Sequence, residues 1–519
     1  MLAILGLELG VFLSLIMFVI FMAMILTGYN VAFSFAATAV AFAFIGDLTD
    51  TFDPNALNSL PGRWFAALND QNLLAVPLFV LMGAILERSG LAERLLTAIG
   101  MLMGGLRGGV AGAVVIVGTL LAAATGVVAA TVIVMGLLSL PAMLRLGYDH
   151  KLATGVITAS GTLAQLLPPS IVLILLAQQL SVGILNLFAG ALLPGLLLAG
   201  LYIGYVLIIS FARPQVGPAM PLEQRRLAGN PSVSAKLKIS AVLSLLVGLT
   251  MLLADARTSL VAMVLSFVAI FAILSATKML AAEVVVSIVP ILLLIIGVLT
   301  AIFQGVATPS ESGAVGVFGA LILTGTNWLF DRILHAEGAE HITPRWRLGG
   351  AELKQAGQST ANIVVLVLTL LFASTFFSLM FFQLGGSDQT SEWLTSIGGG
   401  KFGFVVVSMI SLFLLCINLE FIEITFFVVP IFVPAMIELG FSDNDLVWFA
   451  VLMAVNLNMA FISPPVGFSL FYLQSVAPNE VETASIHKGA IPFMALQGVA
   501  LVILAVFPGI TFFSIDFFG

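Results

Sequence analysis

The sequence predicts an all-α polytopic membrane protein whose two halves are related and lie upside down relative to each other. Of its 519 residues, 60% are hydrophobic and only 9% are charged, whereas a soluble domain carries about 25% charged residues. The motif PAMLRLGY at 141–148 returns as PAMIELGF at 434–441, and each copy is followed about thirty residues later by a Pro-Pro pair. Arg145 in the first copy is replaced by Glu438 in the second, which indicates that the copies face opposite sides of the membrane.

Apolar runs follow one another along the whole chain, and many reach the roughly 20 residues that a membrane-spanning helix needs. The short alternating segments of a transmembrane barrel are not visible. The first run, 5–26, is too long for a cleaved signal peptide and lacks its basic flank, so it predicts a first span. Twelve spans are expected, at 5–26, 31–46, 73–86, 151–180, 184–211, 239–254, 260–276, 284–303, a stretch ending near 330, 362–382, 446–473 and 491–513.

The distribution of Lys and Arg orients these spans, because cytoplasmic loops hold an excess of basic residues. The loop at 47–72 is acidic and is expected outside, whereas 87–107 and 213–238 are basic and are expected in the cytoplasm. Both termini are then outside. Of the 19 Lys and Arg residues, three lie outside, namely Arg63, Arg257 and Lys401.

Two long apolar segments do not fit a simple crossing. Basic residues flank 109–144 on both sides and acidic residues flank 402–437 on both sides, so each segment begins and ends on one side of the membrane. Each predicts a re-entrant hairpin, the first with its turn near Thr125 and Gly126. Two very short spans or one kinked span are the alternative. Irregular backbone at membrane depth is tolerated only where it is buried in protein or lines a cavity, so the turns are functional candidates.

Each Pro-Pro pair predicts a break inside a membrane helix, one in 151–180 and one in 446–473. Proline lacks a backbone donor and blocks the helical hydrogen bond of the preceding turn, which frees carbonyl groups in the middle of the span. The expected organisation is a first inverted repeat at 1–212, a cytoplasmic linker with an additional pair of spans at 213–283, and a second inverted repeat at 284–519.

The two turns and the two breaks predict cation sites. Carbonyl and hydroxyl oxygens are ligands for a hard cation such as sodium, while the N-termini of half-helices attract carboxylates. The simpler alternative is that proline and glycine only kink helices for packing. We expect one sodium site near Thr125, Gly126, Gly161 and Thr162, and a mirrored one near Asn418, Asn458 and Ser463. The full set of candidate substrate- or cation-binding residues is Thr125, Gly126, Gly161, Thr162, Pro168, Pro169, Asn418, Glu420, Asn456, Asn458, Ser463, Pro464 and Pro465.

Glu420 and Glu423 are acidic residues within an apolar run, where such side chains are costly and indicate function. Glu420, at the expected second tip, could face water or a coupling cation, and Glu423 could lie near the interface. A proton relay through either is possible, although the sequence places no histidine nearby to complete it.

Four stretches resemble the large membrane subunit of TRAP transporters, the DctM-like permease. They are LLAAATGVVAATVIVMGLLSLPAMLRLGYDHKLATGVITASGTLAQLLPPSIVLILLAQQLSV, GVATPSESGAVGVFGAL, EFIEITFFVVPIFVPAMIELGF and NLNMAFISPPVGFSLFYLQSVAP. The resemblance covers nearly the whole chain. Within the family, the sequence is most similar to the mannitol- or chloroaromatic-type branch.

The resemblance implies an inverted-repeat ion-transporter fold of the elevator type, in a sodium-coupled uptake system of the bacterial inner membrane with both termini periplasmic. It implies two protein partners: a small four-helix membrane subunit and a periplasmic substrate-binding protein that delivers an organic acid. Sodium ions are the coupling ions, and no other cofactor is expected. Two features depart from the family pattern. The first turn, usually rich in Ser and Gly, reads ATGVV at 124–128, and Glu420 stands where Asp is usual.

Other functions fit the sequence less well. A stand-alone cation-coupled carboxylate transporter would need no binding protein, but the outer loops are too short to capture a scarce solute. A membrane-embedded enzyme would need intramembrane nucleophile or acid-base arrangements, which are absent from the sequence. A basic stripe with interleaved aromatic residues is also absent, which argues against nucleic acid as a partner.

Overall fold

The computed structural model describes residues 8–225, 231–251, 256–276, 279–335, 348–416 and 419–518, and within these ranges the chain forms helices and connecting turns without a β-strand. Eleven of these helices are long and apolar enough to cross a membrane, or up to 13 if each of two bent pairs is one span. The all-helical polytopic architecture is therefore confirmed. The eleven helices include Val128–Arg145 and Phe421–Glu438, which the sequence places in the two hairpins, so they do not match the twelve expected spans one for one.

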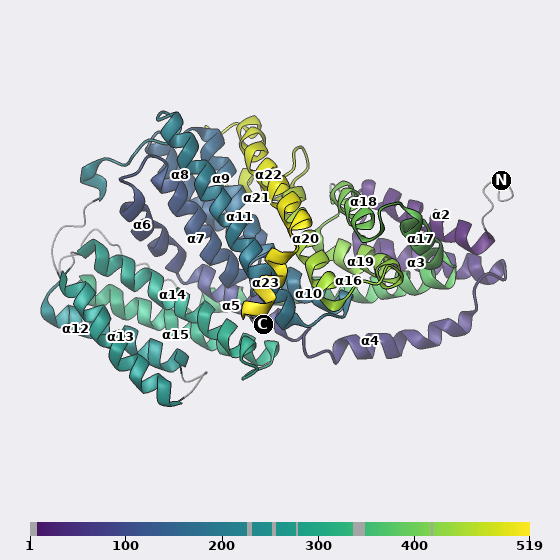
Figure 1. The fold of residues 1–519 in the computed structure, drawn as a ribbon, viewed down its shortest axis with the longest axis horizontal. Helices are drawn as coiled ribbons and strands as arrows, with labels where there is room; N and C mark the ends of the chain where they lie inside the picture. Colours follow the sequence, from purple (N-terminus) through teal and green to yellow (C-terminus); the bar gives the residue numbers. More distant parts are fainter. Residues whose placement is uncertain are drawn as a thin grey trace.

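Figure 1 shows an elongated molecule in which a central group of helices lies between two lateral groups. The first lateral group contains α5 (Ala75–Arg88), α6 (Leu91–Met103), α12 (Val233–Met251), α13 (Ala256–Ala276), α14 (Met279–Phe303) and α15 (Pro309–His335). The second contains α2 (Leu9–Leu26), α3 (Val31–Leu48), α4 (Leu60–Leu68), α16 (Gly350–Gln383), α17 (Gly386–Ser396), α18 (Gly400–Leu415) and α19 (Phe421–Glu438).

The central group contains α7 (Gly109–Thr125), α8 (Val128–Arg145), α9 (His150–Thr162), α10 (Ile171–Leu180), α11 (Ile184–Ala212), α20 (Asp443–Phe461), α21 (Phe468–Gln474), α22 (Thr483–Val506) and α23 (Gly509–Phe518). Three short 3₁₀ turns complete the described structure: η1 (Pro54–Ser59), η2 (Leu163–Gln165) and η3 (Leu222–Arg225).

Polar side chains at loop ends determine where several helices start. Asn30 accepts hydrogen bonds from the first backbone N–H groups of α3, and Asp149 does the same for α9. Ser442 caps α20 and accepts from the Asp445 N–H. Such caps satisfy backbone donors that have no partner within the helix.

Helices from the two halves of the chain interlock. α10, which follows the first Pro-Pro pair, packs against α19 and α20, and α21, which follows the second pair, packs against α8 and α9. In the same way, α14 and α15 pack against α6 and α5, while α2 and α3 pack against α17 and α16. This packing of helices from one half against helices from the other is expected of two interlocked repeats with opposite orientation.

Three segments that were expected to be loops contain helices, and one of them is the segment 47–72, which contains α4. The chain bends by 61° after α5 and continues as α6, where the sequence predicts a cytoplasmic loop. Leu91, Leu95 and Ile99 are buried on one face of α6, against α7 and α14, although neighbouring charges obscure this apolar period in the sequence. Likewise α17 replaces the expected acidic outer loop, and a bend of 117° separates it from α18.

The last expected span, 491–513, is also divided. α22 begins earlier, at Thr483, and ends at Val506, and the separate helix α23 follows Pro508. Proline cannot donate the backbone hydrogen bond that would continue α22. α23 turns back onto α11 and α20.

A buried ionic cluster joins α6 to α14 and α15. The Arg94 guanidinium lies 2.7 Å from the Glu283 carboxylate and 2.8 Å from that of Asp331, and it donates to the Asn327 side-chain oxygen. Arg94 is only 1% exposed. The sequence places this residue in a basic cytoplasmic loop, whereas the structure places it in the protein interior because its two acidic partners lie far away in the chain.

We expect Arg94→Met to destabilise the protein by about 3–5 kcal/mol, because the Glu283 and Asp331 carboxylates would remain buried without their cation. Adding Glu283→Gln and Asp331→Asn should recover most of the loss. The measurement is the midpoint of thermal unfolding in detergent. Arg332→Met is the matched control, since Arg332 is exposed and lies over the Trp328 ring at 4.9 Å, a contact contributing about 1 kcal/mol or less. Equal midpoints for the two methionine variants would contradict this role of the cluster.

Candidate functional site

The first helical hairpin turns at Gly126, between α7 and α8, where the sequence predicts its tip. Gly126 has a φ of +62°, a left-handed conformation that L side chains rarely adopt. A Cβ atom there would lie 3.3 Å from the Pro169 carbonyl oxygen, so the tip touches the first Pro-Pro break. On the other side, a Cβ atom on Gly83 of α5 would lie 2.6 Å from the Cα of Thr125. The tip is therefore held between α5 and the break.

The two candidate threonines of the first half face different neighbours. The Thr125 and Thr131 hydroxyls form a hydrogen bond of 2.9 Å within the hairpin. The Thr162 hydroxyl, near the end of α9, accepts a 3.4 Å hydrogen bond from Gln497 of α22, which also donates to the Tyr202 hydroxyl of α11. The structure thus brings Thr125 and Gly126 to the break and directs Thr162 toward α11 and α22.

Gly161 lies next to Thr162 on α9 and packs against α8. A Cβ atom at this position would lie 2.3 Å from a methyl group of Val132. Gly161 therefore permits close approach of the hairpin and the broken helix, in addition to any backbone ligand that it supplies.

The first break separates α9 from α10. η2 follows α9 directly, and the Pro168–Pro169 peptide is cis. Gln165 in η2 is fully buried, and neither atom of its amide has a hydrogen-bond partner among the described residues. The Ser170 hydroxyl donates to the backbone carbonyl of Gln165 at 2.9 Å. Sequence reasoning missed Gln165, although a polar amide directly before a Pro-Pro pair in an apolar run is a signal that could have found it.

The second break separates α20 from α21 in the same manner. The Pro464–Pro465 peptide is cis, with Pro464 half-buried and Pro465 exposed. The Gly467 N–H donates to the Ser463 carbonyl at 2.8 Å, and the Ser469 hydroxyl donates to the Phe461 carbonyl at 3.0 Å. The second of these bonds satisfies the Phe461 carbonyl, whose donor in a continuous helix would be the N–H that Pro465 lacks.

Two asparagines of α20 are buried before this break. The Asn456 amide donates to the Met409 carbonyl of α18 at 2.7 Å, so it joins the broken helix to the second hairpin. Within the described part of the chain, the Asn456 side-chain oxygen and both polar atoms of Asn458 have no hydrogen-bond partner. A buried polar group without a partner costs about 1–3 kcal/mol, so these atoms are suited to a bound ligand. Asn418 lies outside the described residues.

The second hairpin carries two carboxylates at the start of α19. The Glu423 carboxylate accepts the backbone N–H of Glu420 at 2.9 Å, and the Tyr472 hydroxyl of α21 donates to the Glu420 carboxylate at 3.2 Å. The second hairpin therefore contacts the helix that follows the second break, as the first tip contacts the first break. Tyr472 is the second functional candidate that sequence reasoning missed, because its partner lies 52 residues away in the chain.

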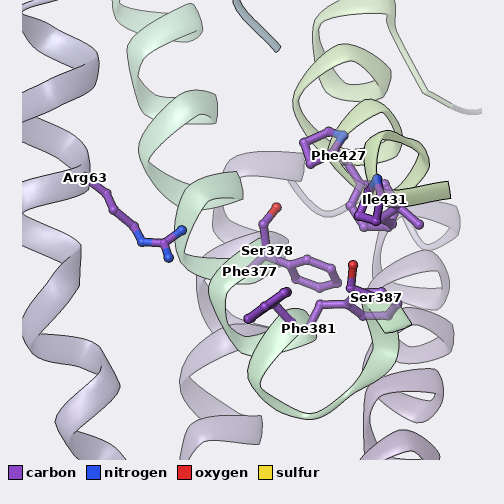
Figure 2. A pocket seen from close by; sticks show the side chains of 10 residues that line it. Arg63, Phe377, Ser378, Phe381, Ser387, Phe427 and Ile431 are labelled. Atoms are coloured by element: carbon purple, nitrogen blue, oxygen red, sulfur yellow. The ribbon is translucent and has the colours of Figure 1, made fainter. Parts of the chain in front are cut away.

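A cavity of about 250 Å³ lies beside the second hairpin, between α4, α16, α17 and α19. In Figure 2, the Arg63 side chain extends from its helix toward Ser378, and Phe377, Phe381 and Phe427 surround the hollow. Among the described residues Arg63 forms no salt bridge. An uncompensated guanidinium over an aromatic hollow can attract a carboxylate or a similar anion.

Comparisons with known proteins identify the family of this chain. Residues 18–510 match the family described as DctM: Tripartite ATP-independent periplasmic transporter, DctM component. The C4-dicarboxylate TRAP transporter large permease protein DctM of Pseudomonas aeruginosa is 26% identical over 461 residues, which cover 89% of this chain and 90% of that protein. The isethionate TRAP transporter permease protein DctMQ of Oleidesulfovibrio alaskensis is 25% identical over 456 residues, covering 86% of this chain and 59% of that protein.

Among solved structures, the Alcanivorax borkumensis YdaH transporter is similar with a TM-score of 0.49 and 14% identity, over 88% of this chain and 90% of that chain. The relatives do not confirm the mannitol- or chloroaromatic-type branch. The family match nevertheless covers nearly the whole chain. This chain therefore belongs to the DctM family, the large permease component of tripartite ATP-independent periplasmic transporters.

Proposed function

We propose that this permease imports organic acids across the bacterial inner membrane by sodium symport. The observation that carries the proposal is the convergence of a hairpin and a broken helix in each half, with buried polar atoms at the breaks. Carbonyl, hydroxyl and amide oxygens suit a hard cation, and broken helices at a repeat interface are typical of ion-coupled secondary transporters. No further cofactor is part of the proposal.

The two ion sites have different support. Around the second break, the side-chain oxygens of Asn456 and Asn458 are buried and free to coordinate, and Ser463 and Asn418 complete the expected set. Around the first break, the Gln165 amide joins the Thr125–Gly126 turn as a potential ligand. The Thr162 hydroxyl faces Gln497. Thr162 would therefore contribute to the first ion site through its backbone or by positioning its helix.

The cavity beside the second hairpin suits an anionic substrate. Arg63 supplies the positive charge and the surrounding phenylalanines supply an apolar wall. The two relatives described above are named for a C4-dicarboxylate and for isethionate, and both compounds are small organic anions. This supports an organic acid as the substrate class of this chain.

We further propose that the chain works with a periplasmic substrate-binding protein and a small membrane subunit, with both of its termini in the periplasm. The repeat cores would move as an elevator relative to the helices around them. Family membership supports these partners, because the family is tripartite.

The test is uptake of organic acids into proteoliposomes, with the binding protein, the small subunit and an inward sodium gradient each added or withheld. Uptake that requires sodium and the binding protein supports the proposal. Uptake without the binding protein would instead make this chain a stand-alone carboxylate transporter. Uptake driven by a proton gradient alone would contradict sodium coupling.

We expect Asn458→Leu and Gln165→Leu to raise the sodium concentration for half-maximal uptake, since each removes one buried amide oxygen. A loss of about 1–3 kcal/mol per ligand corresponds to roughly five- to 150-fold in apparent sodium affinity. The measurement is initial uptake rate against sodium concentration. Gln358→Leu is the matched control, because this glutamine is exposed on α16. Unchanged sodium dependence in both buried-site variants would remove these amides from the ion sites.

We expect Glu420→Gln to reduce sodium-driven uptake at least about tenfold, because a neutral amide stabilises a bound cation less than a carboxylate does. Tyr472→Phe should have a smaller effect, because it removes one hydrogen bond to the Glu420 carboxylate and retains the charge. Glu423→Gln is the matched control, because an amide oxygen can still accept the Glu420 N–H. A larger defect in Glu423→Gln than in Glu420→Gln would reverse the assigned roles.

A further inference from the structure

A basic cavity lies on the outside of the central group, away from both breaks. It has a volume of about 210 Å³ and lies between the start of α9, the end of α11 and the first turns of α22. These three helices pack against one another, and Figure 1 shows them side by side. One basic side chain from each helix region lines the cavity: Lys151, Arg213 and Lys488.

The cavity has an excess of positive charge, because its side chains supply three positive charges and one negative charge. None of its three basic side chains forms a salt bridge within the described ranges of the chain. Asp149 also lines the cavity, but its carboxylate already accepts the Lys151 and Leu152 backbone N–H groups at 2.8 and 3.2 Å as the cap of α9. Three like charges repel one another, and an anion bound between them would remove this repulsion.

Much of the remaining wall of the cavity is apolar, and exposed apolar side chains occur on two of the same helices. The Tyr205 and Phe493 rings meet edge to face at 5.2 Å and form part of the lining. Neighbouring side chains on α11 and α22 are exposed, with Phe211 at 55%, Ile208 at 70% and Ile491 at 48%. A ligand that fits both surfaces has a compact anionic group attached to a long apolar chain.

We propose that this cavity binds the phosphate headgroup of an anionic phospholipid. The cavity lies at the basic side of the molecule, which the excess of Lys and Arg assigns to the cytoplasm. Basic pockets between membrane helices on that side are suited to anionic headgroups. The lipid phosphate lies between Lys151, Arg213 and Lys488, and its acyl chains follow the exposed apolar side chains of α11 and α22. The bound headgroup joins the ends of three helices that carry Thr162, Tyr202 and Gln497.

The experiment measures binding of phosphatidylglycerol to the purified full-length chain in detergent, with phosphatidylcholine and inorganic phosphate as the other ligands. The test variant combines Lys151→Gln, Arg213→Gln and Lys488→Gln. The matched control combines Arg107→Gln, Lys238→Gln and Lys354→Gln, which changes the net charge equally at exposed positions expected on the same side.

The expected result is at least about tenfold weaker phosphatidylglycerol binding by the test variant and a change below about twofold in the control. The charge-preserving combination of Lys151→Arg, Arg213→Lys and Lys488→Arg should bind as the wild type does. If the test variant aggregates, the three single glutamine variants replace it, and each should bind measurably less.

Three outcomes would overturn the proposal. Wild-type binding by the test variant, or by all three single variants, would exclude this cavity as the site. Equal affinity for phosphatidylcholine would exclude recognition of a net negative headgroup. Displacement of phosphatidylglycerol by inorganic phosphate at equal phosphate concentration would assign the cavity to a soluble anion instead of a lipid.

Discussion

The structure depends on one constraint: a backbone group without a partner cannot face lipid. The two Pro-Pro pairs interrupt membrane helices and free carbonyl groups, so each break must be enclosed by protein. The fold encloses them by interlocking its halves. α10 and α21, the helices that leave the breaks, each pack against a hairpin and a broken helix of the opposite half. The same enclosure excludes lipid from the polar atoms of Gln165 and Asn458, which makes the breaks usable as ion sites.

The two lateral groups are held together internally by different kinds of contact. On one side, Arg94 of α6 is held by buried carboxylates of α14 and α15. On the other side, Phe427 of the second hairpin packs among aromatic rings of α2, α3 and α16, with centroids 5.1–5.6 Å apart. Ionic contacts require one geometry, whereas aromatic surfaces accept several offset arrangements.

Sequence reasoning was accurate where a signal is local. Both hairpins and both breaks lie where flanking charges, glycine and the Pro-Pro pairs predict them, and the first turn is at Gly126 as expected. It failed for α6, whose charged residues hid the apolar face, and for α17, whose buried residues are small or polar: Gly386, Ser387 and Ser391. It also missed Gln165 and Tyr472 as site candidates and placed Arg94 in a cytoplasmic loop. For Arg94 and Tyr472, the partners lie in segments distant in the chain, so no local pattern reveals them. For Gln165, the neighbouring Pro-Pro pair was a local signal that was not used.

The sequence by itself determined the class of protein, the paired motifs and the positions of the breaks, because hydropathy, proline geometry and charge bias act over a few turns of helix. The tertiary structure decided which side chains meet. It directed Thr162 toward Gln497 instead of the first tip, paired Glu420 with Tyr472, and gathered Lys151, Arg213 and Lys488 around one cavity. These contacts join residues that are tens to hundreds of positions apart. Only the packing of whole helices, driven by the need to enclose the two breaks, brings them together.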